Sequence, residues 1–444
     1  MGVGEYLKEF MRKECACGKS HEIALPQIVV EKGAIARLPK LVNEYKGTKI
    51  FVLADVNTYS SAGKAVCEIL NKAEIAYSCY VNPETALEPD EKAVGSVVMH
   101  YDHACDLIIS VGSGVLNDIG KILAATTGNP YFIVGTAPSM DGYASATSSM
   151  SMDGLKVSLP SKCADVIIGD IDILKKAPMR MLQSGLGDMI AKYVSIAEWR
   201  IAHEITGEYY CEEIAELVRV ALQRCVENAE GLLRRDDNAV KAVFEGLVIG
   251  GVAMAFAGVS RPASGVEHYF SHVWDMRGLE YGTKVDLHGI QCAIATLIAA
   301  RLYEKVLTLT PDKEKALEYV KNFRYEKWCE ELRAFLGKGA ETMIALEEKE
   351  GKYSVEKHAK RLDVILEKWD TICQIIKDEI PTPKEIEKIL DKIGAPKTAK
   401  GVGIVCSLFT TFQATKDIRD KYVLSRLVWD LGVIEELGEN LENE

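Results

Sequence analysis

The amino-acid sequence predicts two parts of different fold class: an α/β part with a Rossmann-like parallel sheet in residues 1–177, and an all-α part in residues 178–444. Two observations lead to this prediction. Up to about residue 175, short apolar runs alternate with helix-like stretches, which is typical of parallel strands joined by helical crossovers. After Ala177-Pro178, apolar residues recur mostly at helical spacing, and glycine and proline fall into short breaks.

The α/β part contains apolar runs of strand length at residues 27–30, 49–54, 76–81, 106–111, 130–135 and 166–169. The run at 106–111 is rich in β-branched residues and predicts a strand that is buried on both faces. Residues 61–72 and 89–100 are helical segments expected between strands. In the all-α part the expected helices are residues 181–202, 208–234, 238–256, 287–307 and 355–377, and the segment 311–400 is dense in Lys and Glu, as on a solvated helical surface.

Composition and charge exclude several classes of protein. Lys+Arg 53 against Asp+Glu 65 gives a net charge of −12, whereas a nucleic-acid-binding protein needs a basic face, so no nucleic-acid partner is expected. The longest apolar run, residues 247–259, is shorter than the roughly 20 residues of a membrane span, and it predicts a buried helix. The N-terminus lacks the apolar core of a signal peptide, so we expect a cytoplasmic protein whose 12 cysteines are reduced.

Two loops rich in small and polar residues directly follow expected strands. In the first, Gly112-Ser113-Gly114 lets the backbone turn tightly, and the helix that follows would present free N–H groups to an anion such as a pyrophosphate. This turn lacks the third glycine of G-x-G-x-x-G, so a plain strand-to-helix connection stays an alternative. The second loop, residues 135–145, lies where loops that leave parallel strands form a binding crevice, although the same residue types also build ordinary turns. Its polar residues include Thr136, Ser139, Asp141 and Ser145.

One carboxylate and three histidines form the most specific pattern. Asp188 lies at the start of a helical stretch, His268 and His272 are about one helical turn apart and face the same way, and His288 follows closely. One carboxylate with two or three imidazoles suits a divalent transition metal, and core or surface histidines with structural roles are the alternative. A metalloprotease motif is excluded, because H-E-x-x-H needs Glu where this chain has Tyr269.

Two further features stay open between a binding site and a structural role. The N-terminal Cys15, Cys17 and His21 have the look of a metal knuckle but supply only three ligands, which favours a capping or packing role. Asp55 follows an expected strand, where its carboxylate could accept hydrogen bonds from ribose or adenosine hydroxyls or could cap a helix N-terminus.

These segments together resemble the iron-containing alcohol dehydrogenase superfamily over about residues 25–300. Val29-Val30-Glu31-Lys32-Gly33-Ala34, the glycine-rich turn, the polar loop and the Asp/His/His set follow one another in that family's order. The loop 136–145, Ser264-Gly265-Val266-Glu267-His268 and the N-terminal Cys-x-Cys-Gly-Lys-x-His are similar to the sn-glycerol-1-phosphate dehydrogenase branch, which includes the bacterial AraM-like enzymes. The resemblance implies the fold shared by dehydroquinate synthase and iron-containing alcohol dehydrogenase.

The resemblance implies one divalent metal, Zn, Ni or Fe, bound by Asp188, His268 and His288. In the broader superfamily a histidine four positions after the aspartate is a further ligand. This chain has Lys192 there, and three protein ligands leave coordination positions open for a substrate oxygen.

The resemblance also assigns cofactor and substrate contacts. NAD(H) or NADP(H) is the implied cofactor, and Asp55 would disfavour the 2′-phosphate of NADP if it reaches the ribose. Asp141, Asp188 and His272 are the implied catalytic residues and substrate contacts. The implied NAD(P) contacts are Asp55, Gly114, Val115, Leu116, Asn117, Asp118, Thr136, Ala137, Pro138, Ser139 and Ser145.

The implied activity is reversible hydride transfer between dihydroxyacetone phosphate and sn-glycerol 1-phosphate, in phospholipid metabolism, by a homodimer or larger homo-oligomer. A glycerol dehydrogenase or other polyol dehydrogenase is one alternative. A sugar-phosphate cyclase of the dehydroquinate synthase type is another, although its Gly-Gly-Lys-Thr loop is absent here, and a nucleotide-binding regulator with a vestigial metal set is a third. Candidate cations for the substrate phosphate are Arg261, Arg277, Lys284 and Lys156.

Overall fold

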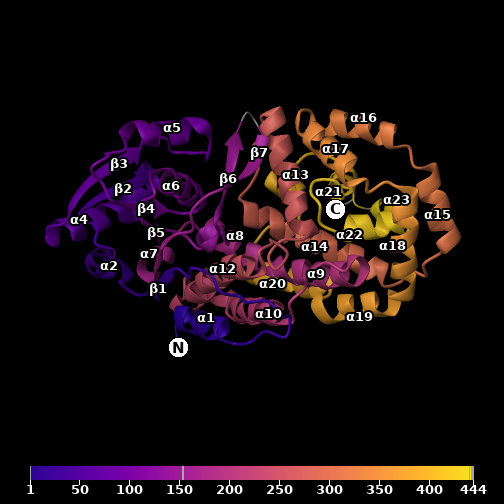
Figure 1. The fold of residues 1–444 in the computed structure, drawn as a ribbon, viewed down its shortest axis with the longest axis horizontal. Coiled ribbons are helices and arrows are strands. Elements are labelled where there is room, and N and C mark those ends of the chain that lie inside the picture. The colour runs from indigo at the N-terminus through magenta and orange to yellow at the C-terminus, as the bar shows by residue number, and fades with distance from the viewer. Residues whose placement is uncertain (1, 153–154, 440, 442–444) are drawn as a thin grey trace. The chain divides into compact units, whose positions relative to one another are not determined.

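The computed structural model of the chain describes residues 2–152, 155–439 and 441 (Figure 1). The chain forms two compact units: unit 1 comprises Met1–Met189 and Glu216–Val259, and unit 2 comprises Ile190–Ala215 and Ser260–Glu444. Unit 1 contains all the strands of the described residues, and unit 2 is built from helices. The expected boundary between residues 177 and 178 does not coincide with the limits of these units, and it stays a prediction.

A parallel six-stranded sheet forms the centre of unit 1, with the strand order β1-β8-β5-β4-β2-β3. Each strand predicted from the sequence is confirmed, with bounds that differ by at most one residue at either end. The α/β fold of this part is therefore confirmed as well. The strands are β1 (Gln27–Glu31), β2 (Lys49–Asp55), β3 (Ala76–Asn82), β4 (Leu107–Gly112), β5 (Tyr131–Gly135) and β8 (Val166–Asp170).

Helices pack on the sheet because the strands are apolar on both faces. In Figure 1 the strands β2, β3 and β4 lie among α2, α4, α5 and α6. Leu41 of α2 and Val66 of α4 share one fully enclosed apolar cluster with Val52 of β2. These helices are α2 (Leu38–Glu44), α4 (Lys64–Lys72), α5 (Glu91–His100) and α6 (Gly114–Thr127). A short π-helix, Tyr59–Gly63, directly precedes α4.

A two-stranded antiparallel hairpin, β6 (Thr147–Met152) and β7 (Leu155–Pro160), is a pair of strands that the sequence analysis missed. Its strands are short and carry Ser, Lys and Met in place of β-branched residues, so no apolar run marks them. The dipeptide Asp153-Gly154 between two alternating segments is a hairpin signal in the sequence and could have revealed them.

Helix α12 (Asp237–Ala257) belongs to unit 1 and is a core helix. It is the one helix of the described residues that is long and apolar enough to cross a membrane, but 83% of its most apolar window is buried inside the protein. The expectation of a buried helix over residues 247–259 is therefore confirmed. Its Phe244 packs against the backbone of Gly135 and Gly169, at the ends of β5 and β8. The remaining helices of this part of the chain are α1 (Val3–Met11), α3 (Val56–Thr58), α7 (Ile171–Leu174), α8 (Met179–Ile190), α10 (Glu212–Glu227) and α11 (Ala229–Leu233).

Unit 2 is all-helical in its described residues, as predicted, and its helices enclose one large apolar cluster. The expected helices are present, but three of them are interrupted: residues 181–202 form α8 and α9, residues 208–234 form α10 and α11, and residues 355–377 form α18 and α19. The charged segment 311–400 is mostly helical, with apolar residues such as Leu362 and Ile372 in the core. Glu347 and Glu379 are charged residues of this segment that are buried as well. The helices are α9 (Lys192–Thr206), α13 (Val266–Tyr281), α14 (His288–Val306), α15 (Lys313–Asn322), α16 (Tyr325–Leu336), α17 (Gly339–Glu350), α18 (Val355–Glu367), α19 (Trp369–Glu379), α20 (Pro383–Lys392), α21 (Leu408–Thr415), α22 (Leu424–Asp430) and α23 (Ile434–Gly438).

The close contact between α12 and the sheet predicts a large stability effect at Gly169. A Cβ added there would lie 2.4 Å from Phe244 Cε1, so Gly169→Ala should destabilise unit 1 by about 1–3 kcal/mol through overpacking. Gly95→Ala in α5 is the matched control, because a Cβ at Gly95 meets nothing within 4 Å. We expect that control to be neutral or slightly stabilising in thermal and urea denaturation. Equal melting temperatures for the two variants would contradict the packing argument.

Candidate active site

The glycine-rich turn joins β4 to α6 in unit 1. Gly114 is the first residue of α6. A Cβ added to Gly112 would lie 2.5 Å from Leu116 Cδ1, so glycine is what allows the helix to begin so close to the strand. Ser113 is the N-cap residue, but its Oγ contacts Ser139 Oγ of the polar loop rather than capping the helix. The N-terminus of a fourteen-residue helix thus faces the end of the sheet, where backbone N–H groups favour an anion.

The polar loop after β5 is held from the side by α6. Asn117 is fully buried, and its side-chain amide donates to the carbonyl of Gly142 at 3.0 Å. Lys121, also fully buried, lies 2.8 Å from the Asp118 carboxylate and donates to the carbonyl of Thr147. Asn117 and Asp118 were predicted to contact NAD(P), and in the structure both have a further role in holding the loop in place.

Helix α8 brings Asp188 to the same loop. A Cβ added to Gly185 would lie 1.8 Å from the carbonyl oxygen of Pro138, so glycine lets α8 touch the loop backbone. One turn later, the fully buried Asp188 accepts a hydrogen bond of 2.9 Å from the backbone N–H of Asp141. The structure thus brings together the predicted cofactor loop, the predicted substrate contact Asp141 and the predicted metal ligand Asp188.

Asp55, at the end of β2, is a helix N-cap. Its Oδ1 accepts hydrogen bonds from the backbone N–H groups of Asn57 and Thr58 at 2.9 and 2.8 Å. Both bonds end on the same carboxylate oxygen, so the capping role is compatible with a second role for Oδ2. Contact with the ribose therefore stays a prediction.

The histidines predicted as ligands meet within unit 2. His268 lies in the first turn of α13 and His288 is the first residue of α14, and their ring centroids are 5.0 Å apart. His268 Nδ1 is held at 2.7 Å by Glu267 Oε1, and His288 Nδ1 is held at 2.8 Å by Ser271 Oγ. When Nδ1 carries the proton for such a contact, Nε2 is left with a lone pair for a metal. Glu267 and Ser271 are orienting residues that the sequence analysis did not single out.

Cys292 joins the two histidines and was also missed. It lies one turn after His288 in α14, is buried, and has its Sγ 3.6 Å from His288 Nε2. The donor atoms of Cys292, His268 and His288 all lie within 4.8 Å of one another. Burial alone would raise the pKa of Cys292, but the neighbouring His268 and His288 lower it below its ordinary value. The i, i+4 spacing of His288 and Cys292 on one helix is the sequence signal that could have found it.

His272 lies beside this set, with its ring centroid 6.0 Å from that of His288. Burial, followed by the charges of Arg419, His288, His268 and Lys421, lowers the pKa of His272 well below its ordinary value. The ring is therefore neutral at pH 7, and it can donate one hydrogen bond and accept another. The two cations that act on it, Arg419 and Lys421, come from the segment between α21 and α22.

Two of the cations that the sequence offered for a phosphate have structural roles instead. Arg261 is buried, forms an ion pair with Glu208 at 2.6 Å and donates to the carbonyl of Tyr422 at 2.8 Å. Arg277 stacks on the ring of Phe335 at 4.2 Å and donates to its carbonyl. The guanidinium groups of Arg261 and Arg277 are thus engaged by other residues of unit 2. Arg419 and Lys421 are therefore further candidates for binding the substrate phosphate.

One buried carboxylate fixes the helix that carries His268 and His272. Glu198 of α9 accepts a hydrogen bond of 2.8 Å from the N–H of Val266, the first residue of α13, and another of 2.8 Å from the N–H of Leu424, the first residue of α22. Tyr303 of α14 donates to it at 3.1 Å. Burial, and then the charge of Glu267, raises the pKa of Glu198 to about 8. Glu198 is therefore protonated at neutral pH.

Comparison with known proteins identifies the family of this chain. Residues 29–178 match the family described as iron-containing alcohol dehydrogenase. The glycerol-1-phosphate dehydrogenase [NAD(P)+] of Halalkalibacterium halodurans is 28% identical over 412 residues, which cover 91% of this chain and 93% of that protein. The glycerol-1-phosphate dehydrogenase [NAD(P)+] of Hyperthermus butylicus is 35% identical over 286 residues, which cover 64% of this chain and 80% of that protein.

A solved structure confirms the fold. The crystal structure of glycerol dehydrogenase from Schizosaccharomyces pombe superposes with a TM-score of 0.58 and 16% identity, over 96% of this chain and 93% of that one. The α/β sheet, the helical second part and the order of the motifs thus define an oxidoreductase fold of the iron-containing alcohol dehydrogenase type. Within it, the chain belongs to the glycerol-1-phosphate dehydrogenase family, so the resemblance found in the sequence is confirmed.

The double cap by Glu198 predicts a specific defect. Glu198→Ala leaves three buried donors without their acceptor and should destabilise unit 2 by about 3 kcal/mol or more. The amides of Val266 and Leu424 should then exchange with deuterium faster than in the wild type. Glu198→Gln is the matched control, because it keeps the oxygen that accepts from Leu424 and Tyr303. This variant should lose less stability than Glu198→Ala. Unchanged exchange at both amides in the alanine variant would contradict the capping role.

Proposed function

We propose that this protein is an NAD(P)- and metal-dependent oxidoreductase that interconverts dihydroxyacetone phosphate and sn-glycerol 1-phosphate. Membership of the glycerol-1-phosphate dehydrogenase family is the observation that carries the proposal. The arrangement of His268 and His288 supports it, since both rings are oriented by hydrogen bonds at Nδ1. We also propose a cytoplasmic homodimer or larger homo-oligomer, which light scattering on the purified protein tests.

Asp188, His268 and His288 are the proposed metal ligands. One carboxylate and two imidazoles suit Zn, Ni and Fe(II) alike, and the fixed Nδ1 contacts leave Nε2 of each ring for coordination. Cys292 lies at the same pair of rings, and a thiolate there would favour Zn over harder ions. A bound divalent ion would polarise the ketone oxygen of the substrate and stabilise negative charge on it as hydride arrives.

The remaining proposed residues bind and orient. The N-terminus of α6, which begins at Gly114, and the loop 136–139 would hold the pyrophosphate and nicotinamide half of NAD(P). Asp55, at the end of β2, would accept hydrogen bonds from the adenosine ribose and so favour NAD over NADP. Asp141 would hold the terminal hydroxyl of the substrate, and this contact selects the ketone face that meets the nicotinamide. His272, a neutral ring, would donate a hydrogen bond to the reacting oxygen or relay its proton.

Arg419 and Lys421 are the proposed partners of the substrate phosphate. Both act electrostatically on His272, the proposed substrate contact, and Lys421 donates to the carbonyl of Ser264 at 2.7 Å. Burial, and then the charges of Arg261 and Arg419, lowers the pKa of Lys421 to about 7. A group that is only half-charged near neutrality gains charge when a phosphate dianion binds, so the proposed contact strengthens in the complex.

The activity predicts a stereochemical result. NAD(P)⁺ reduction should proceed with sn-glycerol 1-phosphate and be at least about tenfold slower with its enantiomer, because a single substrate contact of about 1.4 kcal/mol discriminates to that extent. Enzyme treated with a chelator should lose turnover and recover it with Zn, Ni or Fe(II). Equal NADH oxidation with dihydroxyacetone and its phosphate would indicate a polyol dehydrogenase instead. Turnover without net cofactor change would indicate a cyclase.

The phosphate contact predicts a pH effect. Lys421 loses its charge as the pH rises through about 7, so the KM for dihydroxyacetone phosphate should increase above that pH. Lys421→Arg keeps the charge and should flatten this rise, whereas Arg419→Ala should raise the KM about 10-fold or more at every pH. Dihydroxyacetone without the phosphate is the control substrate, and its KM should not change in either variant. An equal change for both substrates would contradict the assignment.

A further inference from the structure

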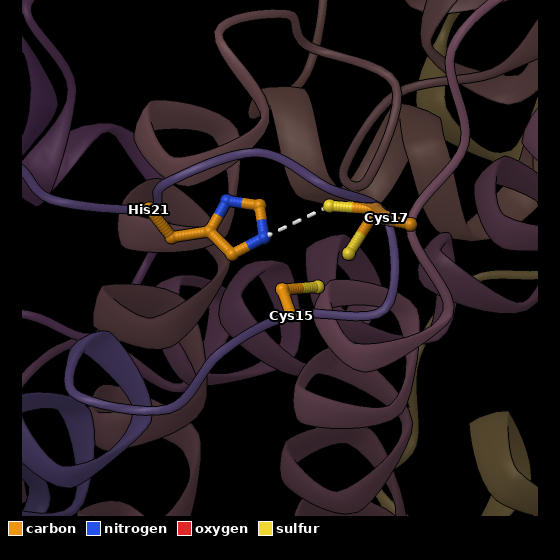
Figure 2. A group of neighbouring side chains, drawn as sticks. Cys15, Cys17 and His21 are labelled. Atoms are coloured by element: carbon orange, nitrogen blue, oxygen red, sulfur yellow. Dashed lines mark hydrogen bonds between the residues drawn. The ribbon is translucent and has the colours of Figure 1, made fainter.

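We propose that Cys15, Cys17 and His21 bind a second divalent metal ion of the zinc type, with a structural role in unit 1. The three side chains come from one loop and point toward one another (Figure 2). Cys17 Sγ lies 3.4 Å from His21 Nε2, and one donor atom from each residue lies within 4.8 Å of the others. Donor atoms around one zinc ion lie at comparable separations, since each sits about 2.0–2.3 Å from the metal.

His21 is oriented for ligation. Its ring is 5% exposed, and its Nδ1 is 3.3 Å from the carbonyl oxygen of Phe256, which can only accept a hydrogen bond. A proton on Nδ1 can donate to this carbonyl, and in that tautomer Nε2 turns its lone pair toward the sulfur of Cys17. A metal-binding histidine usually donates its other ring N–H to an acceptor such as a backbone carbonyl. The rings of Phe10 and Phe256, with centroids at 5.9 and 6.2 Å, enclose it.

The backbone brings the two cysteines together by a tight turn. Gly18 N–H donates to the carbonyl of Cys15 at 3.0 Å, and Gly18 has φ 74°, in the left-handed region that favours glycine. Residues 13–26, between α1 and β1, form neither helix nor strand. A segment of this length with little regular structure gains most from a crosslink, because the ligated ion replaces the backbone hydrogen bonds that a helix or strand would supply.

The donor set selects the ion. Two thiolates and one imidazole are soft and borderline ligands, typical of Zn(II) sites that stabilise a fold. The proposed catalytic set, with one carboxylate and two imidazoles, is harder and more open. A fourth position of the tetrahedron would be filled by water or a further ligand. A lone S–H···N hydrogen bond between Cys17 and His21 would need no second thiol, so the presence of Cys15 beside them favours a metal.

The ion would fasten the N-terminal segment to α12. Phe256 is the penultimate residue of this helix, and its carbonyl is among the last four, which have no partner within the helix. By holding His21 in place, the metal would keep this carbonyl capped and α1 seated through its buried Val3 and Leu7. None of the proposed ligands belongs to the proposed catalytic or cofactor-binding residues, so loss of the ion should leave turnover intact at moderate temperature.

The test is the metal content of the purified full-length enzyme loaded with Zn(II). We expect about two ions per chain in the wild type and about one in the double variant Cys15→Ser/Cys17→Ser, which should melt at a lower temperature but keep its kcat at 25 °C. Cys79→Ser, at an exposed cysteine of the same unit, is the matched control and should bind as much metal as the wild type. Equal metal content in the double variant and the wild type would overturn the proposal.

A second measurement uses only the wild type and covers the case in which the double variant does not fold. Zn(II) should protect Cys15 and Cys17 from alkylation at least about tenfold, as read by mass spectrometry, and a chelator should abolish this protection. Protection of Cys15 and Cys17 to the same extent with and without metal would overturn the proposal. Because activity is not the readout, failure here leaves the proposed function untouched, and failure of the proposed activity leaves this site untouched.

Discussion

The structure of unit 2 depends on one buried carboxyl group. Glu198 accepts from the first N–H of α13 and from the first N–H of α22, two groups that a helix cannot satisfy itself. Burial, and then the charge of Glu267, raises the pKa of Glu198 to about 8, so Glu198 is neutral at pH 7 and does not repel Glu267. Glu267 in turn holds His268 Nδ1 at 2.7 Å. The ring that is the proposed metal ligand is therefore set by the same pair of acids that determines where α13 begins.

In unit 1 the main constraint is that backbone segments approach one another closely at the ends of the parallel strands. Gly112 lets α6 start beside β4, and Gly185 lets α8 touch the loop after β5. These contacts place the N-terminus of α6, the polar loop and Asp188 at one edge of the sheet. An anion-binding helix end and a carboxylate can then lie near each other, because no Cβ separates the segments.

Much of this fold follows from local patterns, and the exceptions have physical causes. The buried strands are continuous apolar runs such as Leu107–Gly112, so periodicity finds them. The β6–β7 hairpin is polar and was missed. His268 and His288 could be proposed from residue type and spacing, and the i, i+4 spacing from His288 also marks Cys292. Glu267 and Ser271 could not be proposed in this way, because their roles depend on which way a ring faces. Long-range partners such as Glu198 and Leu424, far apart in sequence, leave no local signal at all.

Lys192 shows how a departure from the superfamily pattern is accommodated. It stands four positions after Asp188, where the resemblance to the broader superfamily implies a further ligand, and in this chain it is fully buried, with its ammonium group 3.1 Å from the carbonyl of Ala263. Ser195, one turn along α9, donates to the neighbouring carbonyl of Pro262 at 3.2 Å. Both contacts hold the segment that leads into α13 and His268. Lys192 thus supports the segment that carries His268. In the proposed site, with Asp188, His268 and His288 as the three protein ligands, a coordination position would stay open for a substrate oxygen.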